Sequence, residues 1–386
     1  MRIVVVGSGT SVHALTRSAA IASRGHEVRL VTLGQVFPVE GIEVRTRPIP
    51  TTLVEAAKAA RAFLNDIHAF EPDLMHLHYA GGKLGTMATL SRVHPLVVTV
   101  MGGDVLPEQH PGGQSRLERR ATRRVLEESD LILVKSDKLR PAMANYGNFS
   151  NKVETVRWGV DPDHYHPDPG GAQALRKRLG LSEEDRIVLS VRHIIPLYNV
   201  HLIVEAMPRV VESIPKACLL IAAYKVDSSY LQSIKSQVER LGVRDRIRFI
   251  GQREQWEMPS LYSLAEVLVS IPSSDGLPQS LFEAMACRTP VVLGRLSAYE
   301  DVVKENESVL FVDFTPEAVA RSIIRLMSEP TLKGRIVAQA FETVQEVASL
   351  PRDLERVELF YGALLETRLV RRSPRLVIDA LSLLFR

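Results

Sequence analysis

The chain has 386 residues, of which 45% are hydrophobic, and its 48 lysines and arginines nearly balance 45 aspartates and glutamates. This length predicts two domains, because a single hydrophobic core rarely serves more than about 250–300 residues. The small net charge of +3 argues against a nucleic-acid-binding protein, and the two cysteines lack the spacing of a zinc site or disulfide framework, which indicates a reducing, cytoplasmic setting.

The first half of the chain alternates short β-branched runs with amphipathic segments. Ile3–Val6 predicts a strand buried on both faces, and residues 12–23 predict a helix that Gly25 ends. Such alternation predicts a doubly wound parallel sheet. Further strands are predicted at 27–32, 74–78, 96–101 and 131–135, and helices near 52–70, 83–93 and 116–128, with a short helix from Asp137.

A stretch rich in proline and glycine, Gly159–Gly171, predicts the linker between two domains. We therefore predict an α/β fold of two Rossmann-like domains that face each other across a cleft. The expected division is 1–165, 166–348, and C-terminal helices at 349–386 that cross back to the first domain. The second series predicts strands at 187–191, 218–222, 247–250, 267–271 and 290–293, and helices at 199–214, 229–241, 258–263, 278–286, 316–328, 332–348 and 350–366.

Ligands of open α/β sheets bind beyond the carboxyl ends of the strands, so motifs at strand ends are the candidate sites. The first such motif, Gly-Ser-Gly-Thr-Ser-Val at 7–12, includes Gly9 and Thr10. A dinucleotide site is disfavoured, because Val12 stands where a third glycine belongs and the second strand ends without a carboxylate. The motif is either a simple tight turn or a turn that lines the cleft.

The second motif spans residues 273–292, where Asp275 follows a predicted strand and Glu283 lies eight residues later on a predicted helix. The start of that helix offers backbone amides and a favourable dipole to a diphosphate, and a carboxylate such as Glu283 can accept hydrogen bonds from ribose hydroxyls. Two acids that only cap and solvate a helix remain the alternative. The predicted donor site also includes Gly276, Leu277, Pro278 and Gln279.

This segment closely resembles the signature of the retaining family 4 glycosyltransferases of GT-B fold. Their pattern is a glutamate, seven residues, a second glutamate with Ala-Met-Ala, and a Pro-Val-Val strand. Asp275 replaces the first glutamate, while Glu283–Ala286 and Pro290–Val292 match it. Gly25–Val28 and Gly159–Asp161 fit the family as well, so the resemblance covers nearly the whole chain.

The resemblance implies roles for residues at three further strand ends. Arg192 matches an arginine that holds the donor diphosphate, but Tyr198 stands where the family usually has a lysine, so Tyr198 or another group such as His193 must compensate. Met101 likewise stands where a histidine is usual. Asp104 in the following Gly-Gly-Asp contacts a sugar hydroxyl or only stabilises a turn, and Gly251 holds the base through its main chain.

Histidines and a tyrosine near the ends of two first-half elements are predicted to contact the acceptor. His78 and Tyr79 end a predicted strand, and His13 lies early in the first helix. Each histidine is alternatively a satisfied, partly buried side chain. The His76-x-His78 spacing permits a metal, but with no carboxylate nearby we expect none.

The resemblance to this family implies a retaining, metal-independent hexosyltransferase that uses no cofactor. Its co-substrate is a nucleotide-diphosphate sugar, and its acceptor is a glycan or lipid-linked glycan of cell-envelope synthesis. A nucleotide-sugar-binding protein without catalysis and a nucleotide-sugar 2-epimerase remain alternatives.

The end of the chain combines basic and apolar residues. Arg368, Arg371, Arg372 and Arg375 precede the largely apolar residues 376–385, which either contact the inner face of a membrane or form a helix packed on the first domain. We expect no secretory signal and no membrane-spanning helix.

Overall fold

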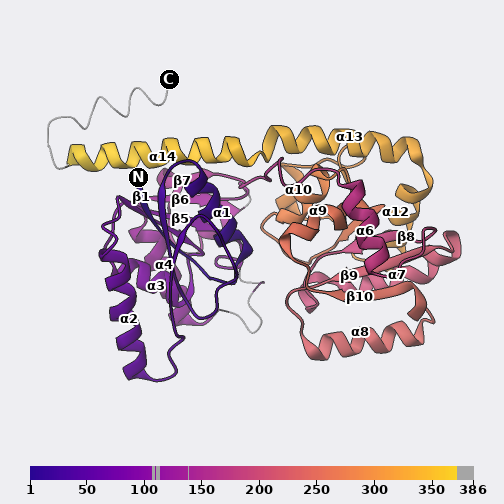
Figure 1. Ribbon diagram of the computed structural model, residues 1–386, viewed down its shortest axis with the longest axis horizontal. Helices are drawn as coiled ribbons and strands as arrows, with labels where there is room; N and C mark the ends of the chain where they lie inside the picture. The colour runs from indigo at the N-terminus through magenta and orange to yellow at the C-terminus, as the bar shows by residue number, and fades with distance from the viewer. Residues whose placement is uncertain (107–108, 110–113, 138, 372–386) are drawn as a thin grey trace. The chain divides into compact units, whose positions relative to one another are not determined.

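A computed structural model describes residues 1–106, 109, 114–137 and 139–371 (Figure 1). The chain forms two compact units: unit 1 contains residues 1–158 and the C-terminal segment from Pro351, and unit 2 contains residues 159–350. The first boundary therefore falls before Gly159 and not after residue 165. Residues 159–165 belong to unit 2 because Val160 donates a backbone hydrogen bond to Ala348 at 2.8 Å and Tyr165 is buried in the core of that unit.

Unit 1 is built on a parallel sheet whose strand order, β3-β2-β1-β4-β5-β6-β7, is that of a doubly wound fold. The sequence pattern did not predict β3 or β7, because β3 is a charged, partly exposed edge strand and β7 has only three residues. The strands are β1 (Arg2–Val6), β2 (Glu27–Leu33), β3 (Glu43–Arg47), β4 (Leu74–His78), β5 (Leu96–Val100), β6 (Leu131–Val134) and β7 (Val153–Thr155).

Helices cover both faces of this sheet (Figure 1). Successive strand residues point to opposite faces, so Val4, Val6 and Leu77 share a core cluster with residues of the helices on one face, while His76 and His78 point to the other. The first face carries α2 (Leu53–His68), α3 (Gly82–Leu90), α4 (Arg116–Glu128) and α5 (Leu139–Met143), and the second carries α1 (Val12–Ser23) and α14 (Leu350–Arg371).

The last helix, α14, is anchored on unit 1 by polar contacts. Glu358 accepts hydrogen bonds from Arg24 at 2.9 Å and pairs with His26 at 3.0 Å. The hydroxyl of Tyr361, which is fully buried, lies 2.5 Å from Nδ1 of His76. The expected return of the C-terminal helix to the first domain is therefore observed for the part of α14 after Leu350.

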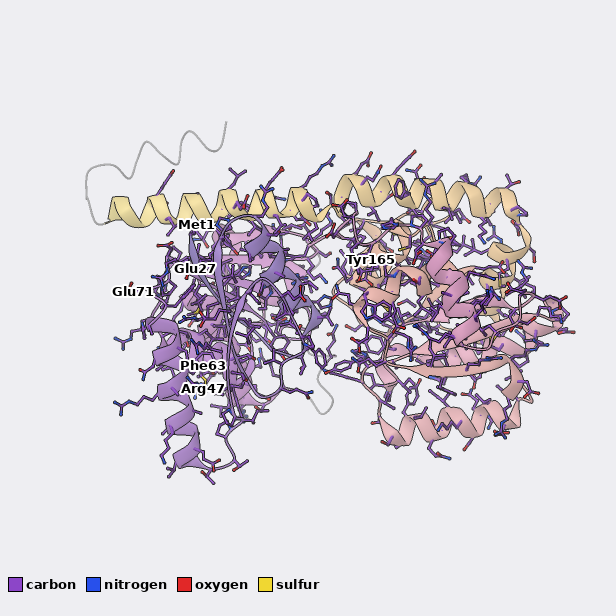
Figure 2. All side chains as sticks on the ribbon, in the orientation of Figure 1. Met1, Glu27, Arg47, Phe63, Glu71 and Tyr165 are labelled. Carbon is purple, nitrogen blue, oxygen red and sulfur yellow. The ribbon has the colours of Figure 1, made fainter. Side chains whose placement is uncertain are left out.

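The edge strand β3 is held against the sheet by charged side chains. Arg29 donates to Glu43 at 2.7 Å, and Arg47 forms a bidentate pair with Asp66 of α2 at 2.6 and 2.7 Å. Figure 2 labels Arg47 of β3 and Phe63, a fully buried α2 residue. Ion pairs thus replace the apolar pattern that would have marked β3 in the sequence.

Unit 2 repeats the topology of unit 1, with a parallel sheet of order β10-β9-β8-β11-β12-β13. The predicted strands are all present within one or two residues, and only the three-residue β13 was not predicted. The strands are β8 (Arg186–Ser190), β9 (Ala217–Ala222), β10 (Ile247–Gly251), β11 (Val267–Ser270), β12 (Val291–Gly294) and β13 (Leu310–Val312).

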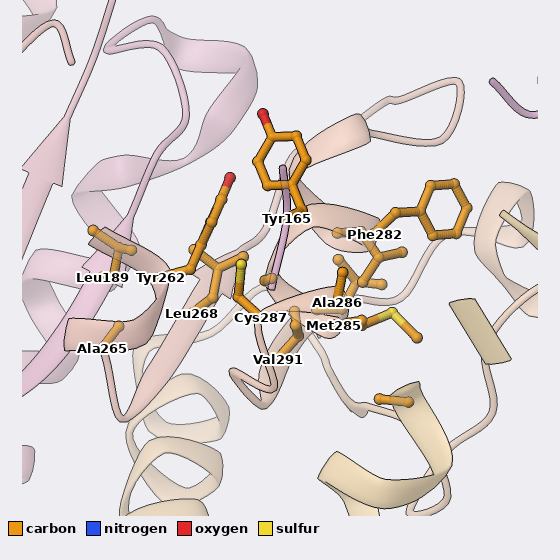
Figure 3. Packing of buried hydrophobic residues seen from close by; sticks show 14 of the residues in the cluster. Tyr165, Leu189, Tyr262, Ala265, Leu268, Phe282, Met285, Ala286, Cys287 and Val291 are labelled. Carbon is orange, nitrogen blue, oxygen red and sulfur yellow. The ribbon is translucent and has the colours of Figure 1, made fainter. Parts of the chain in front are cut away.

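Two hydrophobic clusters lie on opposite faces of the second sheet. Leu189, Leu268 and Val291 belong to one, and Val188, Val269 and Val292 to the other. Figure 3 shows part of the first cluster, with the rings of Tyr165 and Tyr262 at one end and their hydroxyls on the same side. The first cluster contains residues of α6 (Pro169–Arg178), α9 (Met258–Leu264), α10 (Gln279–Ala286) and the short α11 (Ser297–Glu300), and the second contains residues of α7 (Val200–Ser213), α8 (Ser228–Arg240) and α12 (Pro316–Ser328), while α13 (Pro330–Val347) contributes to both.

Helix α6 begins inside the segment predicted to be a linker. Pro169 suits the first position of a helix, and Asp168 caps it by accepting a hydrogen bond from the Gly171 amide at 2.9 Å. A Cβ atom at Gly171 would lie 1.9 Å from Asp168 and 2.3 Å from Ser260, so this glycine permits close packing and does not mark a loop. The unpredicted α11 (Ser297–Glu300) is a single turn.

Within the part of the chain that the structure describes, no helix is long and apolar enough to cross a membrane. The predicted membrane contact through Arg372, Arg375 and residues 376–385 lies outside the described residues.

Candidate functional site

In each parallel sheet, the order in which the chain adds strands reverses at one point. This switch point lies between β1 and β4 in unit 1 and between β8 and β11 in unit 2. The crevice beyond the carboxyl ends of the strands at such a switch point is where open α/β folds bind ligands. Most of the predicted site residues lie in the segments that follow these four strands.

Arg192 and Asp275 follow β8 and β11, and they form an ion pair in unit 2. The Nη2 atom of Arg192 lies 2.6 Å from Oδ2 of Asp275, and the side chains are 12% and 13% exposed. The guanidinium also stacks on the ring of Tyr198 at 4.3 Å. Burial alone would lower the pKa of Arg192, but Asp275 and then Tyr198 outweigh burial and the net shift is upward, so the cation is firmly fixed.

Tyr198 occupies the position where a lysine was expected from the family pattern, and it does not add a second charge. Its ring supports Arg192, and it precedes Asn199, which has φ of 50° and stands where the family has glycine. Asparagine tolerates this left-handed conformation better than most residues. The Asn199 side chain donates to the Ile271 carbonyl at 3.0 Å and so links this turn to the segment after β11.

The loop from Asp275 to the start of α10 has a strained backbone. Leu277 is buried and has φ of 88°, a conformation that costs a residue with a side chain of order 1–3 kcal/mol. Asp275 accepts the Gly276 amide at 2.7 Å, and Pro278 is the N-cap of α10. The Gln279 side chain donates to the Gly159 carbonyl at 2.9 Å. One carboxylate, that of Asp275, thus holds both the Arg192 cation and the loop that leads into α10.

Glu283 lies in the middle of α10 beside two buried tyrosines that the sequence did not single out. Tyr262, on α9, is fully buried and donates its hydroxyl to Oε2 of Glu283 at 2.7 Å. Burial, and then the Glu283 carboxylate, raise the pKa values of Tyr262 and Tyr165 well above the usual range. These tyrosines are 21 and 118 positions from Glu283, so only the tertiary structure reveals them.

Two further aromatic or imidazole groups lie near Arg192. Tyr299, on α11, is fully buried, and burial followed by Asp275 raises its pKa well above the usual range. His193 contacts the Tyr198 ring edge to face, with centroids 5.5 Å apart. Burial, and then Arg192, lower the pKa of His193 to about 4. His193 is therefore neutral at pH 7 and adds no positive charge that could replace the lysine.

Gly251 ends β10 and has φ of 69°, and its carbonyl accepts the Ala223 amide at 3.1 Å. Its conformation is one that glycine adopts at little cost. The main chain thus turns at the end of the strand, as a backbone contact with a base would require.

In unit 1, Gly9 is needed for close packing of the β1–α1 turn. Its amide donates to the Thr32 hydroxyl at 2.9 Å, and a Cβ atom there would lie 2.7 Å from the Gln35 carbonyl and 2.8 Å from Val36. The hydroxyls of Thr10 and Ser8 lie 3.1 Å apart and remain partly or fully exposed. Gly9 thus has a packing role, and the hydroxyl of Thr10 is partly accessible.

The two histidines of β4 have different surroundings. His76 is fully buried between Tyr361 and Thr99, whose hydroxyls lie 2.5 and 2.7 Å from its ring nitrogens. His78 stacks on His76 with ring centroids 4.5 Å apart, yet both nitrogens of His78 are buried without a hydrogen-bond partner. His76 is thus a satisfied structural histidine, and His78 is a candidate to bind a ligand.

Arg17 was not predicted as a site residue, and it lies within electrostatic range of this pair. It is 4% exposed, its Nη1 atom lies 3.2 Å from the Met101 sulfur, and its guanidinium lies 4.8 Å from the centre of the Trp158 ring. The sequence does contain a signal for this residue, because Arg17 lies on the same face of α1 as the buried Ile21 and so interrupts an apolar face with a charge. His13 is one helical turn before Arg17 and is partly exposed.

Asp104 has the contacts of the turn aspartate that the sequence left as an alternative. It is fully buried and accepts backbone amides of Ala80 at 2.8 Å and of Met101 and Gly102 at 3.0 Å. Burial outweighs these hydrogen bonds and raises its pKa. Because its lone pairs are directed to the backbone, we assign Asp104 a role in shaping the loop and not a substrate contact.

Tyr79 follows β4 with φ of 85° and remains 36% exposed. Its hydroxyl donates to the Gly103 carbonyl at 2.8 Å, which ties the end of β4 to the loop after β5. Among the described residues, no group of three or more histidines, cysteines or carboxylates is placed to hold a metal ion.

Comparison with known proteins gives a consistent assignment for both units. Residues 7–164 match the family model described as Glycosyltransferase Family 4, and residues 172–343 match the one described as Glycosyl transferases group 1. The two models adjoin and together cover most of the chain. They meet near the boundary between unit 1 and unit 2.

Curated relatives are similar at low identity. A GDP-mannose-dependent alpha-(1-6)-phosphatidylinositol monomannoside mannosyltransferase of Mycolicibacterium smegmatis is 25% identical over 256 residues, 64% of this chain and 64% of that protein. The matched region thus spans less than two thirds of this relative. An N-acetyl-alpha-D-glucosaminyl L-malate synthase of Bacillus anthracis is 22% identical over 88% of this chain and 90% of its own.

Solved structures share the fold. A sucrose-phosphate synthase of Thermosynechococcus elongatus has a TM-score of 0.82 at 18% identity and covers 95% of this chain and 100% of its own. HepE of Anabaena, in complex with UDP and glucose, has a TM-score of 0.80 at 16% identity and covers 94% of this chain and 100% of its own. The predicted GT-B class of two Rossmann-like domains is therefore confirmed, and the chain belongs to the glycosyl transferases of group 1, family 4.

Proposed function

We propose that this glycosyltransferase is a retaining, metal-independent enzyme that uses a nucleotide-diphosphate sugar. In this proposal unit 2 binds the donor, and unit 1 binds a hydroxyl-bearing acceptor that belongs to cell-envelope glycan or glycolipid synthesis. The observation that carries the proposal is the Arg192–Asp275 pair beside the N-terminus of α10, at the switch point of the second sheet.

The donor diphosphate would lie between two sources of positive charge. The start of α10 presents backbone amides and the positive end of the helix dipole, and the guanidinium of Arg192 lies nearby, oriented by Asp275 and Tyr198. Fixed charges of this kind stabilise the negative charge that grows on a departing diphosphate. In this proposal Asp275 acts by positioning Arg192 and the Gly276 amide.

Glu283 would hold the ribose of the donor. Tyr262 donates a hydrogen bond to one carboxylate oxygen, which fixes the direction of the carboxylate. A carboxylate can accept several hydrogen bonds, so vicinal ribose hydroxyls can bind alongside the tyrosine. The main chain at Gly251 and the α10 loop at Leu277 and Gln279 would complete the nucleotide contacts.

In the transfer step, the acceptor hydroxyl attacks the anomeric carbon from the face that the diphosphate leaves. The bond from the anomeric carbon to the diphosphate oxygen breaks, and a phosphate oxygen accepts the hydroxyl proton. Configuration is retained, and no protein nucleophile or redox cofactor takes part. The protein contributes orientation and charge stabilisation, with no metal ion in this scheme.

The proposal is tested first by donor binding, because a ligand of the native state raises the melting temperature Tm by linkage. UDP-glucose and GDP-mannose head the panel, since HepE is solved with UDP and glucose and the mycobacterial relative is named for GDP-mannose. We expect one nucleotide sugar to raise Tm in the wild type and not in Glu283→Ala. A stable, folded protein that no nucleotide sugar stabilises would contradict the proposal.

Turnover is then measured with the donor so identified. Transfer to hydroxyl acceptors should proceed in EDTA, and the product anomer seen by NMR should match that of the donor. Donor binding without transfer to any glycan or lipid-linked acceptor would instead indicate a binding protein. Conversion of the donor alone to its 2-epimer would indicate an epimerase.

A further inference from the structure

Arg17 brings a positive charge into the interior of unit 1 without a full set of partners. Its side chain is 4% exposed, and its Nη2 atom is buried with no hydrogen-bond partner. The groups it does contact are the Met101 thioether and the Trp158 ring. Neither compensates a buried cation as a hydrogen-bonded carboxylate would.

Arg17 remains charged at neutral pH. Burial lowers its pKa to about 9, and Asp353 of α14 partly opposes this effect. A cation held in this way costs free energy in the unbound protein. An anion that bound to Nη2 would recover part of that cost.

His78 adds a second unsatisfied polar side chain to the same region. It is 4% exposed, and neither Nδ1 nor Nε2 has a hydrogen-bond partner. Burial, followed by the charges of His76, Arg17 and His13, lowers its pKa well below the usual range. A neutral imidazole offers one donor and one acceptor, which suits a hydroxyl group.

The turn that begins α1 starts beside His78, because Val6 of β1 pairs with Leu77 of β4. A Cβ atom at Gly7 would lie 3.4 Å from Cβ of His78 and 3.0 Å from that of Ala14. Arg17 and His78 both lie against Trp158, with the guanidinium 4.8 Å and the imidazole centroid 5.9 Å from the centre of its ring. The amides at the start of α1 and its dipole favour an anion at the same place.

We propose that Arg17, His78 and the N-terminus of α1 form a subsite in unit 1 for a carboxylate or phosphate group on a hydroxyl-bearing substrate. The anion would accept hydrogen bonds from Nη2 of Arg17, and His78 would bind a neighbouring hydroxyl. The inference rests on the proposed function in one respect: it makes that substrate the glycosyl acceptor, which would then be an anionic polyol or sugar.

The test measures Tm of the full-length protein at constant ionic strength. Galacturonate and myo-inositol 1-phosphate are compared with their neutral counterparts galactose and myo-inositol, and inorganic phosphate serves as the simplest anion. We expect at least one anionic sugar or polyol to raise the wild-type Tm more than its neutral counterpart does. Galacturonate and the inositol phosphate distinguish a carboxylate ligand from a phosphate ligand.

Arg17→Leu should abolish this anion-dependent shift. Without any probe, the same variant should melt at the wild-type temperature or higher, because an uncompensated buried charge has been removed. Arg29→Leu is a matched control, since Arg29 is a partly buried unit 1 arginine that pairs with Glu43, and it should keep the anion-dependent shift. Anionic probes that stabilise no more than neutral ones, or that stabilise Arg17→Leu equally, would overturn the proposal.

A substitution in the candidate donor site distinguishes a failure of this subsite from a failure of the proposed function. Arg192→Leu should lose the shift caused by a nucleotide sugar and keep the shift caused by the anionic probe, and Arg17→Leu should show the reverse. An anion-dependent shift that disappears only in Arg192→Leu would place the anion in unit 2 and contradict the subsite. If the wild type showed the Tm shift with the anionic probe but none with any nucleotide sugar, that result would contradict the proposed function and leave the subsite supported.

Discussion

Arg192 and Asp275, 83 positions apart in the sequence, form a nearly buried ion pair of 2.6 Å at the ends of adjacent strands. Asp275 also accepts the amide of Gly276, so one carboxylate holds both the cation and the loop that leads to α10. Removing this carboxylate would therefore affect two parts of the candidate donor site at once.

Asp275→Asn tests this coupling. The variant keeps the shape of the side chain but leaves Arg192 as an uncompensated, mostly buried cation, so we expect a loss of about 1–3 kcal/mol in unfolding free energy. Donor affinity should fall at least about tenfold, equivalent to about 1.4 kcal/mol. Urea unfolding and donor titration measure the two effects.

Glu317→Gln is the control for this substitution, because the Arg209–Glu317 pair is about half exposed. Its loss should change stability by less than about 1 kcal/mol and leave donor affinity unchanged. Equal effects of the two substitutions would show that the Arg192–Asp275 pair has no special role.

Tyr198 is expected to act through its ring and not its hydroxyl. Tyr198→Phe keeps the surface on which Arg192 stacks, so donor affinity should remain within about twofold of the wild type. Tyr198→Ala removes a cation–π contact worth about 0.5–2 kcal/mol, and donor affinity should fall accordingly in titration calorimetry. A large defect in Tyr198→Phe would instead assign the function to the hydroxyl.

Tyr262→Phe should weaken donor binding through Glu283, although Tyr262 itself need not touch the donor. The substitution removes the 2.7 Å hydrogen bond to the carboxylate, a loss of about 1–3 kcal/mol for a buried group. The Kd for the nucleotide sugar should rise. Tyr230→Phe, which alters another partly buried hydroxyl in unit 2, should leave that Kd unchanged, and a similar rise there would argue against the role of Tyr262.

His76 should make unit 1 less stable as pH falls. Burial, and then Arg17, lower the pKa of this histidine in the folded protein to about 3, below an unfolded value of about 6.5. The unfolded state therefore binds the proton first, and stability decreases below pH 6.5 by up to about 1.4 kcal/mol per pH unit. Chemical denaturation of the wild type between pH 7.5 and 4.5 measures this slope.

His76→Gln should be less stable than the wild type at pH 7.5, because the contacts with Tyr361 and Thr99 are altered. The difference should narrow as pH falls, since glutamine does not titrate. Parallel pH curves for the two proteins would show that His76 does not titrate with this depressed pKa.

Two glycine-to-alanine substitutions in unit 2 should have opposite effects. A Cβ atom at Gly159 would lie 1.8 Å from the carbonyl oxygen of Ala348, so Gly159→Ala forces the backbone apart and should cost at least about 1–3 kcal/mol. Gly334 lies within α13 with nothing near its Cβ position, so Gly334→Ala should stabilise by about 0.5–1 kcal/mol. Thermal unfolding of both variants checks the signs, and a neutral Gly159→Ala would contradict the close approach.

The sequence was sufficient to predict most of the strands and helices, because they are specified locally. Ile3–Val6 is β-branched throughout. The observed bounds of α1, α4 and α12 are the predicted ones, because caps and apolar periodicity mark them. It failed at β3 and β13, where charged residues or a very short strand leave no periodic signal. It also failed at Gly171, where close packing requires glycine inside a helix.

For the candidate donor site, too, the sequence contains only the features that are local along the chain. Asp275 and Glu283 lie on one short segment, so their spacing and the helix start between them are visible in the sequence. The pairing of Asp275 with Arg192 and the support of Glu283 by Tyr262 depend on which strands and helices become neighbours. No local pattern contains that information.

The sequence by itself determined the two α/β units and the family to which they belong, because strand runs, turns and the Glu283 motif are local features. Only the tertiary structure decided that His76 is satisfied by Tyr361, 285 positions away, while His78 is not, and that Arg17 is buried beside them. Burial and hydrogen-bond partners are properties of the packed chain, and they separate structural polar residues from those that remain available to a ligand.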